Sequence, residues 1–145
     1  MTRPRWVIDT NVLVSAFLWQ GKPGRLIEMA GEHEVRLLTS RALLDELAAT
    51  LNKKKLAAAV AATGSTAEQM LASYKRIATT VRARALDGRI SRDADDDAVL
   101  ACALAARAAL VVTGDDDLPV LEDFMGIPIV IVGQAVARRE PKAKR

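Results

Sequence analysis

The sequence predicts an α/β protein, a three-layer α/β/α sandwich with a central, mostly parallel sheet of four to five strands. Short apolar runs rich in β-branched residues alternate along the chain with longer segments whose leucines recur at helical spacing. This alternation is typical of parallel strands joined by helices that cover both faces of the sheet. Half of the 145 residues are hydrophobic and only 3% are aromatic, which suits a core of packed aliphatic side chains.

Four segments have the composition of buried strands. The first, Trp6 to Ile8, stops at Asp9, where residues that favour helix caps begin. The others follow at residues 35–39, 110–113 and 128–132. Helical segments separate the first three strands, so these strands are expected to run parallel.

Helices are expected at residues 12–19, 25–31, 41–51, 53–63, 65–81 and 95–107. Ser40 is a favourable N-cap for the third of them, in which Leu43, Leu44, Leu47 and Leu51 form a stripe at helical spacing. Glu46 lies off the centre of that stripe. Ser65 and Glu68 have the spacing of a capping box.

The length is that of one compact domain, which we expect to span residues 1–137. Residues 138–145 form a basic tail without an apolar anchor and are expected to be disordered. The single cysteine, Cys102, excludes an internal disulfide, and the N-terminus does not resemble a signal peptide, so a cytoplasmic location is expected. No apolar stretch has the length needed to cross a bilayer.

Charge is unevenly distributed along the chain. The net charge of +3 permits binding to nucleic acid without requiring it. Seven of the 18 acidic residues fall between Asp93 and Asp117. Several basic residues are candidates either for contact with a phosphate backbone or for ordinary solvated surface, namely Arg76, Arg82, Arg84, Arg89 and Arg92.

The candidate catalytic carboxylates fall where open parallel sheets bind ligands, beyond the carboxyl ends of the strands. Asp9 follows the first strand, and Asp115 follows the strand at 110–113. The run Asp95 to Asp97 opens the preceding helix, and Glu46 lies early in the helix after the second strand. Carboxylates at one place repel each other, so a cation is expected among them. Oxygen ligands without histidine favour Mg²⁺ or Mn²⁺ over zinc and predict chemistry on a phosphate ester.

Taken singly, each of these acids also has a structural explanation. Asp9 is a suitable helix cap, and the Asp95 to Asp97 run places negative charge at a helix N-terminus. Glu46 suits a solvated helix face, and Asp115 suits a turn. Only their shared place at one edge of one sheet favours a catalytic site.

Four segments resemble, in the same order, the elements that carry the acids of one nuclease family. They are Val7–Ala16, Ser40–Leu56, Arg92–Ala101 and Val111–Leu118. On these segments the chain resembles the PIN-domain nucleases, most closely the members regarded as toxins of toxin–antitoxin pairs and related to the VapC-type ribonucleases. The resemblance implies an endoribonuclease that depends on Mg²⁺ or Mn²⁺. It also implies a homodimer and a protein antitoxin as partner.

The resemblance also implies individual roles. Asp9 and one of Asp96 or Asp97 would bind the metal directly. Glu46 would bind the metal or orient water, and Asp115 would act as an outer acid or serve a second metal. Asn11 and Thr113 would support these acids by hydrogen bonding.

The third acid is ambiguous, because Asp96 and Asp97 point about 100° apart on a helix and only one can face Asp9. Counting back from Ala103 favours Asp96 slightly, whereas the apolar pattern at residues 100–102 suits Asp97 equally well. Asp95 and Asp117 are then expected to be cap or surface acids.

Two other functions fit the same residues. The first is a catalytically inactive relative that binds RNA or an antitoxin. The second is another Mg²⁺-dependent phosphoryl hydrolase, although a phosphatase with an aspartate nucleophile would usually carry a second acid at the position of Asn11. The apolar residues of the helical hairpin at 53–81 are candidates either for the core or for a partner surface.

Overall fold

The computed structural model describes residues 3–84, 94–114 and 123–139, and the side chains at 94–96, 123 and 139 are not described. The strands are β1 (Arg5–Ile8), β2 (Arg36–Thr39), β3 (Ala78–Thr80), β4 (Leu110–Thr113), β5 (Asp123–Phe124) and β6 (Ile127–Ile131). The helices are α1 (Thr10–Leu18), α2 (Gly21–Gly31), α3 (Arg41–Leu51), α4 (Ala57–Ala62), α5 (Ala67–Ile77), α6 (Ala94–Ala106) and α7 (Val132–Arg139), with a 3₁₀ turn, η1, at Lys54–Leu56.

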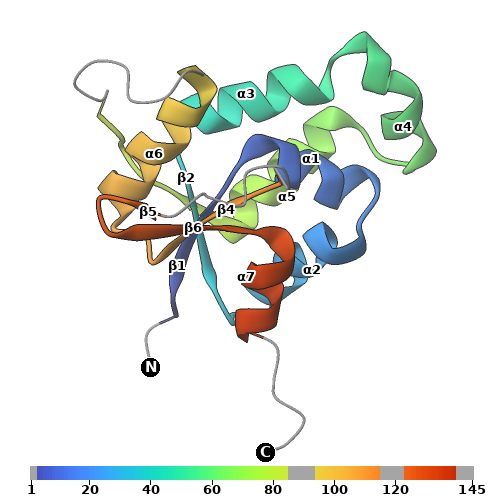
Figure 1. Cartoon of the computed structure of the whole chain (residues 1–145). Coiled ribbons are helices and arrows are strands. Elements are labelled where there is room, and N and C mark those ends of the chain that lie inside the picture. The colour runs from blue at the N-terminus through green and yellow to red at the C-terminus, as the bar shows by residue number, and fades with distance from the viewer. Residues whose placement is uncertain (1–2, 85–93, 115–122, 140–145) are drawn as a thin grey trace, which may run out of the picture.

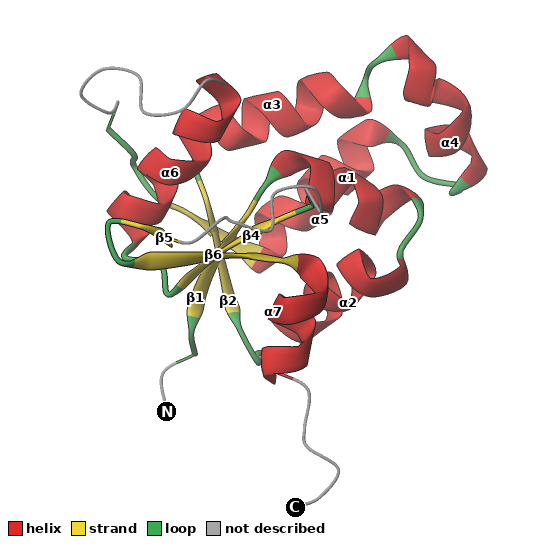
Figure 2. Cartoon of the chain, viewed as in Figure 1, coloured by secondary structure: helices red, strands yellow, loops and turns green. Residues whose placement is uncertain are grey.

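The strands form one sheet in the order β3-β2-β1-β4-β6-β5. Among the described residues, the first five of these strands are parallel, and the two-residue β5 is an antiparallel edge. Helices lie on both sides of the sheet (Figure 2), which confirms the predicted α/β/α sandwich. β1 lies inside the sheet between β2 and β4, so the residues that follow these three strands meet at one edge.

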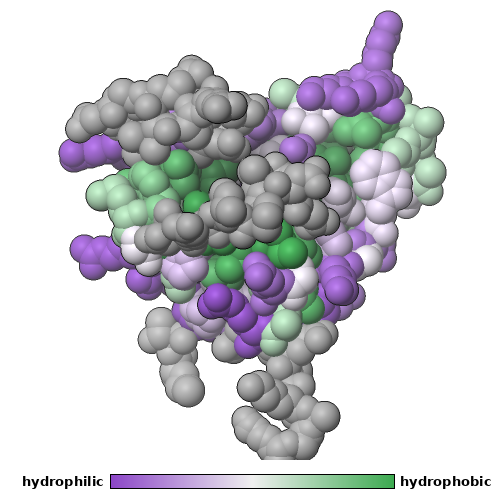
Figure 3. All heavy atoms as spheres, viewed as in Figure 1, coloured by the Kyte–Doolittle hydropathy of each residue, from purple (hydrophilic) through white to green (hydrophobic). Residues whose placement is uncertain are grey.

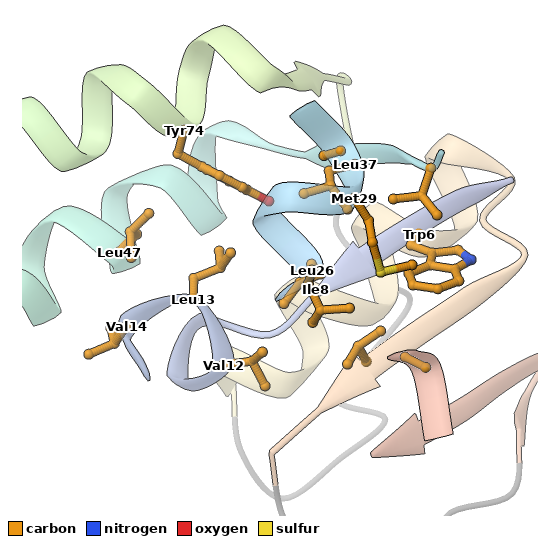
Figure 4. Packing of buried hydrophobic residues seen from close by; sticks show 14 of the residues in the cluster. Trp6, Ile8, Val12, Leu13, Val14, Leu26, Met29, Leu37, Leu47 and Tyr74 are labelled. Atoms are coloured by element: carbon orange, nitrogen blue, oxygen red, sulfur yellow. The ribbon is translucent and has the colours of Figure 1, made fainter. Parts of the chain in front are cut away.

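The two faces of the sheet bury different side chains, as the alternation of residues along a strand requires. Trp6 and Ile8 belong to the larger core, together with residues from α1, α2, α5 and α7. Figure 4 shows part of this core, with the side chain of Met29 beside the ring of Trp6. Val7 faces the smaller core, which α6 covers with Cys102 and small alanines. The smaller core is covered mainly by α6, and the larger one by several helices.

Helix α3 contributes to both cores. Leu43 lies in the smaller core, whereas Leu44, Leu47 and Leu51 lie in the larger one. Ser40 caps the helix by accepting a hydrogen bond from the backbone N–H of Leu43 at 3.3 Å. The predicted cap and leucine stripe are therefore confirmed, and they fix the position of Glu46 on this helix.

Local preference misplaces some element boundaries. The helix expected over 65–81 ends at Ile77, because Ala78–Thr80 pairs in parallel with β2 and extends the sheet. Helix α2 begins at Gly21 instead of residue 25, and both its N-cap, Gln20, and Gly21 itself have a φ of 60°. The capping box of α5 is formed by Thr66 and Gln69, not by Ser65 and Glu68.

The end of the described chain is helical. Helix α7 runs to Arg139 and packs against α2, with Ala135 and Val136 in the larger core. It therefore extends two residues past the domain boundary expected at residue 137. The rest of the expected tail, residues 140–145, lies outside the described residues.

Tyr74 places a polar group deep in the larger core (Figure 4). Its side chain is 1% exposed and its ring packs edge-on against Phe17, with centroids 6.4 Å apart. Within the described part of the chain its hydroxyl has no hydrogen-bond partner, and burial raises the pKa of this phenol far above its usual range. The phenol must therefore stay protonated in the folded protein.

Replacing Tyr74 by Phe is expected to raise the free energy of unfolding by about 1 kcal/mol at neutral pH, because an unsatisfied buried hydroxyl is removed. The pKa of Tyr74 is higher in the folded than in the unfolded chain. The parent protein is therefore expected to lose stability as the pH rises above about 10, where the phenol of the unfolded chain ionises and that of the folded chain does not. Urea unfolding from pH 7 to 11 should show a gain for Tyr74→Phe that grows above pH 10. A variant less stable than the parent at every pH would contradict this.

Candidate functional site

Asp9 lies where β1 ends and α1 begins. Its backbone N–H donates to the carbonyl of Val112 at 3.0 Å, which continues the pairing of β1 with β4 by one residue. Its side chain caps α1, with Oδ1 accepting a hydrogen bond from the backbone N–H of Asn11 at 2.8 Å. The carboxylate is thus held at the carboxyl edge of the sheet, at the end of a central strand that lies between β2 and β4.

The second oxygen of Asp9 is held by the neighbouring strand. Thr113, the last residue of β4, donates from its hydroxyl to Asp9 Oδ2 at 3.2 Å. The register Ile8↔Val112 places these two residues side by side after the paired strands. Both carboxylate oxygens of Asp9 therefore accept a hydrogen bond, and the side chain is oriented before any ligand binds.

Glu46 reaches the same place from α3. The hydroxyl of Thr10, the first residue of α1, donates to Glu46 Oε1 at 2.7 Å. Thr10 is 4% exposed, and Glu46 is half-buried. Asp9 and Glu46 lie 37 positions apart in the sequence. They are nevertheless held by two adjacent residues, because Asn11 donates to Asp9 and Thr10 donates to Glu46.

Helix α6 brings the third acidic segment to this edge. Figure 1 shows α1, the start of α3 and the first turns of α6 at one end of the sheet, away from the end where β1 begins. Asp97, the fourth residue of α6, is half-buried. The side chains of Asp95 and Asp96, and all of Asp115 and Asp117, lie outside the described residues.

Cys102 of α6 lies in the smaller core, where α6 packs against the start of α3. Its thiol is buried beside Ser40, the N-cap of α3. Burial raises the pKa of this thiol from 9.0 to about 12, although the neighbouring Ser40 acts in the opposite direction. The thiol is therefore protonated at neutral pH. His33 is exposed on a loop beside Arg3.

The donors placed at this edge are carboxylate oxygens, which are the ligands that Mg²⁺ and Mn²⁺ prefer. Among the described side chains, no three His, Cys, Asp or Glu residues form a group that could hold a metal ion. Asp9 and Glu46 are nevertheless both fixed at the carboxyl edge, and their chemistry fits a hard divalent cation. Two of the expected donors, Asp96 and Asp115, are among the residues whose side chains are not described.

The supporting residues differ in how they act. Thr113 hydrogen-bonds to Asp9 through its side chain, as expected. Asn11 supports Asp9 through its backbone N–H, while its side chain is exposed. Thr10 was not expected at the site, because its partner Glu46 lies 36 positions away and only the packing of α1 on α3 brings them together.

A comparison with protein families shows to which family the chain is related. The family model described as PIN domain matches residues 5–117. The chain belongs to the PIN-domain family. Members of this family are generally nucleases, and they generally use divalent metal ions. A search of curated proteins found no match for the chain.

The matched part of this PIN domain runs from the start of β1 to three residues beyond Gly114, so it includes every candidate acid. The match ends before β6, which pairs with β4 in parallel, and before the edge strand β5. In the ranges that the structure describes, no helix is long and apolar enough to cross a membrane.

Proposed function

We propose that this PIN domain is a metal-dependent endoribonuclease that hydrolyses the phosphodiester bonds of RNA. The observation that carries the proposal is the placement of two carboxylates at one sheet edge. Asp9 is oriented by Asn11 and Thr113, and Glu46 by Thr10. Such prior orientation is what a site for metal-dependent hydrolysis needs.

In this proposal Asp9 and Glu46 hold a Mg²⁺ or Mn²⁺ ion together with Asp96 or Asp97 and with Asp115. When bound, the ion supplies Lewis-acid activation of a water molecule and screens the charge of the phosphate. The residues of the chain keep the carboxylates in place through the Thr113 and Thr10 hydroxyls. They thereby reduce the reorganisation that the reaction requires.

Positive charge near this edge supports RNA as substrate. Arg82 and Arg84 are exposed and follow the carboxyl end of β3, which is separated from β1 only by β2. Two strand spacings amount to about 10 Å, within the reach of an RNA backbone that enters the site. Arg76 precedes β3 and lies toward the opposite end of that strand, whereas Arg89 and Arg92 lie outside the described residues.

We also propose that the ribonuclease is the toxin of a toxin–antitoxin pair, that it forms a homodimer and that a protein antitoxin binds it. Figure 3 shows apolar atoms over α4, where the alanines at 57, 58, 61 and 62 are exposed. Met70 and Tyr74 of the adjacent α5 belong to the core instead. A small antitoxin-like reading frame beside the gene would support this role.

The direct test is incubation of the purified protein with structured and unstructured RNA in Mg²⁺, Mn²⁺ or EDTA. We expect cleavage with either ion and none in EDTA. Of the single variants Asp96→Asn and Asp97→Asn, one should lose cleavage and the other should keep it, because neighbours on a helix point about 100° apart. Cleavage that persists in EDTA would overturn the proposal. Binding of RNA without cleavage would favour an inactive relative.

A further inference from the structure

Thr10, the first residue of α1, has a buried side chain whose hydroxyl bonds to another helix instead of capping its own. Its side chain is 4% exposed, and its hydroxyl donates to Glu46 Oε1 at 2.7 Å. The cap of α1 is supplied by Asp9, and the Asp9 carbonyl accepts from the backbone N–H groups of Val12 and Leu13. The hydroxyl of Thr10 is therefore not used to begin the helix.

The donor in this bond is rigid, and the acceptor is flexible by nature. Threonine is branched at Cβ and has few χ1 rotamers, and the backbone of Thr10 is fixed between β1 and α1. Glutamate has three rotatable side-chain bonds and loses much freedom when it is ordered. A short bond from Thr10 therefore restricts the rotation of the Glu46 carboxylate more than it restricts Thr10.

The hydrogen bond between Thr10 and Glu46 also links Glu46 indirectly to Asp9. Asp9 is attached to Thr10 through one peptide bond, and its carboxylate is fixed by Asn11 and Thr113. Through Thr10, the orientation of Glu46 is tied to the β1–α1 junction and not only to its own helix. A movement of α3 relative to the sheet would have to break this bond.

We propose that Thr10 is a positioning residue that orients the carboxylate of Glu46 relative to Asp9 for binding of a divalent cation. The inference rests on the proposed function, because Glu46 acts there as a metal-binding or water-orienting acid. Hydrogen-bond partners of metal ligands typically change metal affinity or activity by about 10- to 100-fold when they are removed. Thr10 is expected to have an effect of that size.

The test compares Thr10→Val, which removes the donor and keeps the branched shape, with Thr10→Ser, which keeps the donor. Binding of Mn²⁺ alone is measured by electron paramagnetic resonance, separately from RNA cleavage. We expect Thr10→Val to bind Mn²⁺ about 10-fold more weakly and to lower kcat with little change in KM. Thr10→Ser should restore both quantities to nearly the parent values.

Thr63→Val is the matched control. The Thr63 hydroxyl also donates a short bond, to the carbonyl of Val60 at 2.6 Å, and accepts one from the backbone N–H of Ser65 at 3.1 Å. It lies at the exposed end of α4, away from Asp9 and Glu46 in the sequence. This variant should leave Mn²⁺ binding and kcat unchanged. In the background of Glu46→Gln, Thr10→Val should cause no further loss of Mn²⁺ affinity, because its effect acts through the Glu46 carboxylate.

The outcomes separate this inference from the proposed function. A parent protein that neither binds Mn²⁺ nor cleaves RNA would contradict the proposed function itself. A parent that does both, beside a folded Thr10→Val that binds Mn²⁺ as tightly, would overturn the role of Thr10 alone. If Thr10→Val does not fold, Thr10→Ala is measured in its place. Weak Mn²⁺ binding by Thr10→Ser would also overturn the role of Thr10, because serine keeps the hydroxyl donor.

Discussion

Replacing Asp9 by Asn is expected to lower the rate of RNA cleavage by more than about 10²-fold, because the change removes a charged ligand and not merely a partner of one. The fold should survive. Asp9 is the N-cap of α1, and Asn caps helices about as well as Asp does. The Thr113 hydroxyl can also accept a hydrogen bond from the new amide, since a hydroxyl is both donor and acceptor.

The measurement is single-turnover cleavage of a labelled RNA in Mn²⁺, beside thermal unfolding of the same samples. Asp45→Asn is the matched control, because Asp45 precedes Glu46 on α3 and is exposed. It should cleave RNA at the parent rate. Undiminished cleavage by Asp9→Asn would show that the edge of the sheet at β1 is not the active site.

The same variant tests the toxin role in cells. Induced expression of the parent chain should stop growth, and expression of Asp9→Asn should not, because growth arrest is expected to require RNA cleavage. Equal protein levels must be verified by immunoblot. Arrest by both proteins would favour a role that depends on binding, and arrest by neither would contradict the toxin role while leaving the ribonuclease proposal to the test in vitro.

Replacing Leu47 by Ala is expected to lower the free energy of unfolding by about 2–5 kcal/mol. Leu47 is 0% exposed and projects from α3 into the larger core (Figure 4). The loss combines the apolar surface no longer buried with the cavity that remains. For a chain of this size each kcal/mol corresponds to a fall of about 2–4 °C in Tm, so the total fall is on the order of 10 °C.

The measurement is urea and thermal unfolding of the purified variants. Leu56→Ala serves for comparison, because Leu56 lies in η1 and is only partly buried. It should cost clearly less than Leu47→Ala. A cost for Leu47→Ala equal to that of Leu56→Ala would show that α3 is not anchored to the larger core through this residue.

Much of the sheet could be predicted because its strands carry a strong local signal. The β-branched and aliphatic runs at 110–113 and around Trp6 coincide with β4 and β1, and the leucine stripe of α3 has the predicted bounds. The helix predicted to continue to Val81 was wrong at its end. Ala78–Thr80 becomes a strand only because the edge of β2 supplies backbone hydrogen-bond partners. A pattern of three residues cannot predict such a partner.

The candidate site shows the same division. The position of Asp9 after a strand followed from the sequence, and Thr113 was expected to support the acids. The contact between Thr10 and Glu46 could not be predicted, since a threonine between Asp9 and Asn11 has no sequence feature that names a partner on α3. The contact results from the packing of α1 against α3.

The sequence by itself determined the class of fold, the ends of the central strands and the family, because each depends on short patterns of apolar and acidic residues. The tertiary structure alone decided the order β3-β2-β1-β4-β6-β5, the added edge strands and the way in which Asn11, Thr113 and Thr10 hold two distant acids. The physical reason is that strand order and side-chain hydrogen bonds depend on contacts between segments remote in the chain. Local preferences limit these contacts but do not select them.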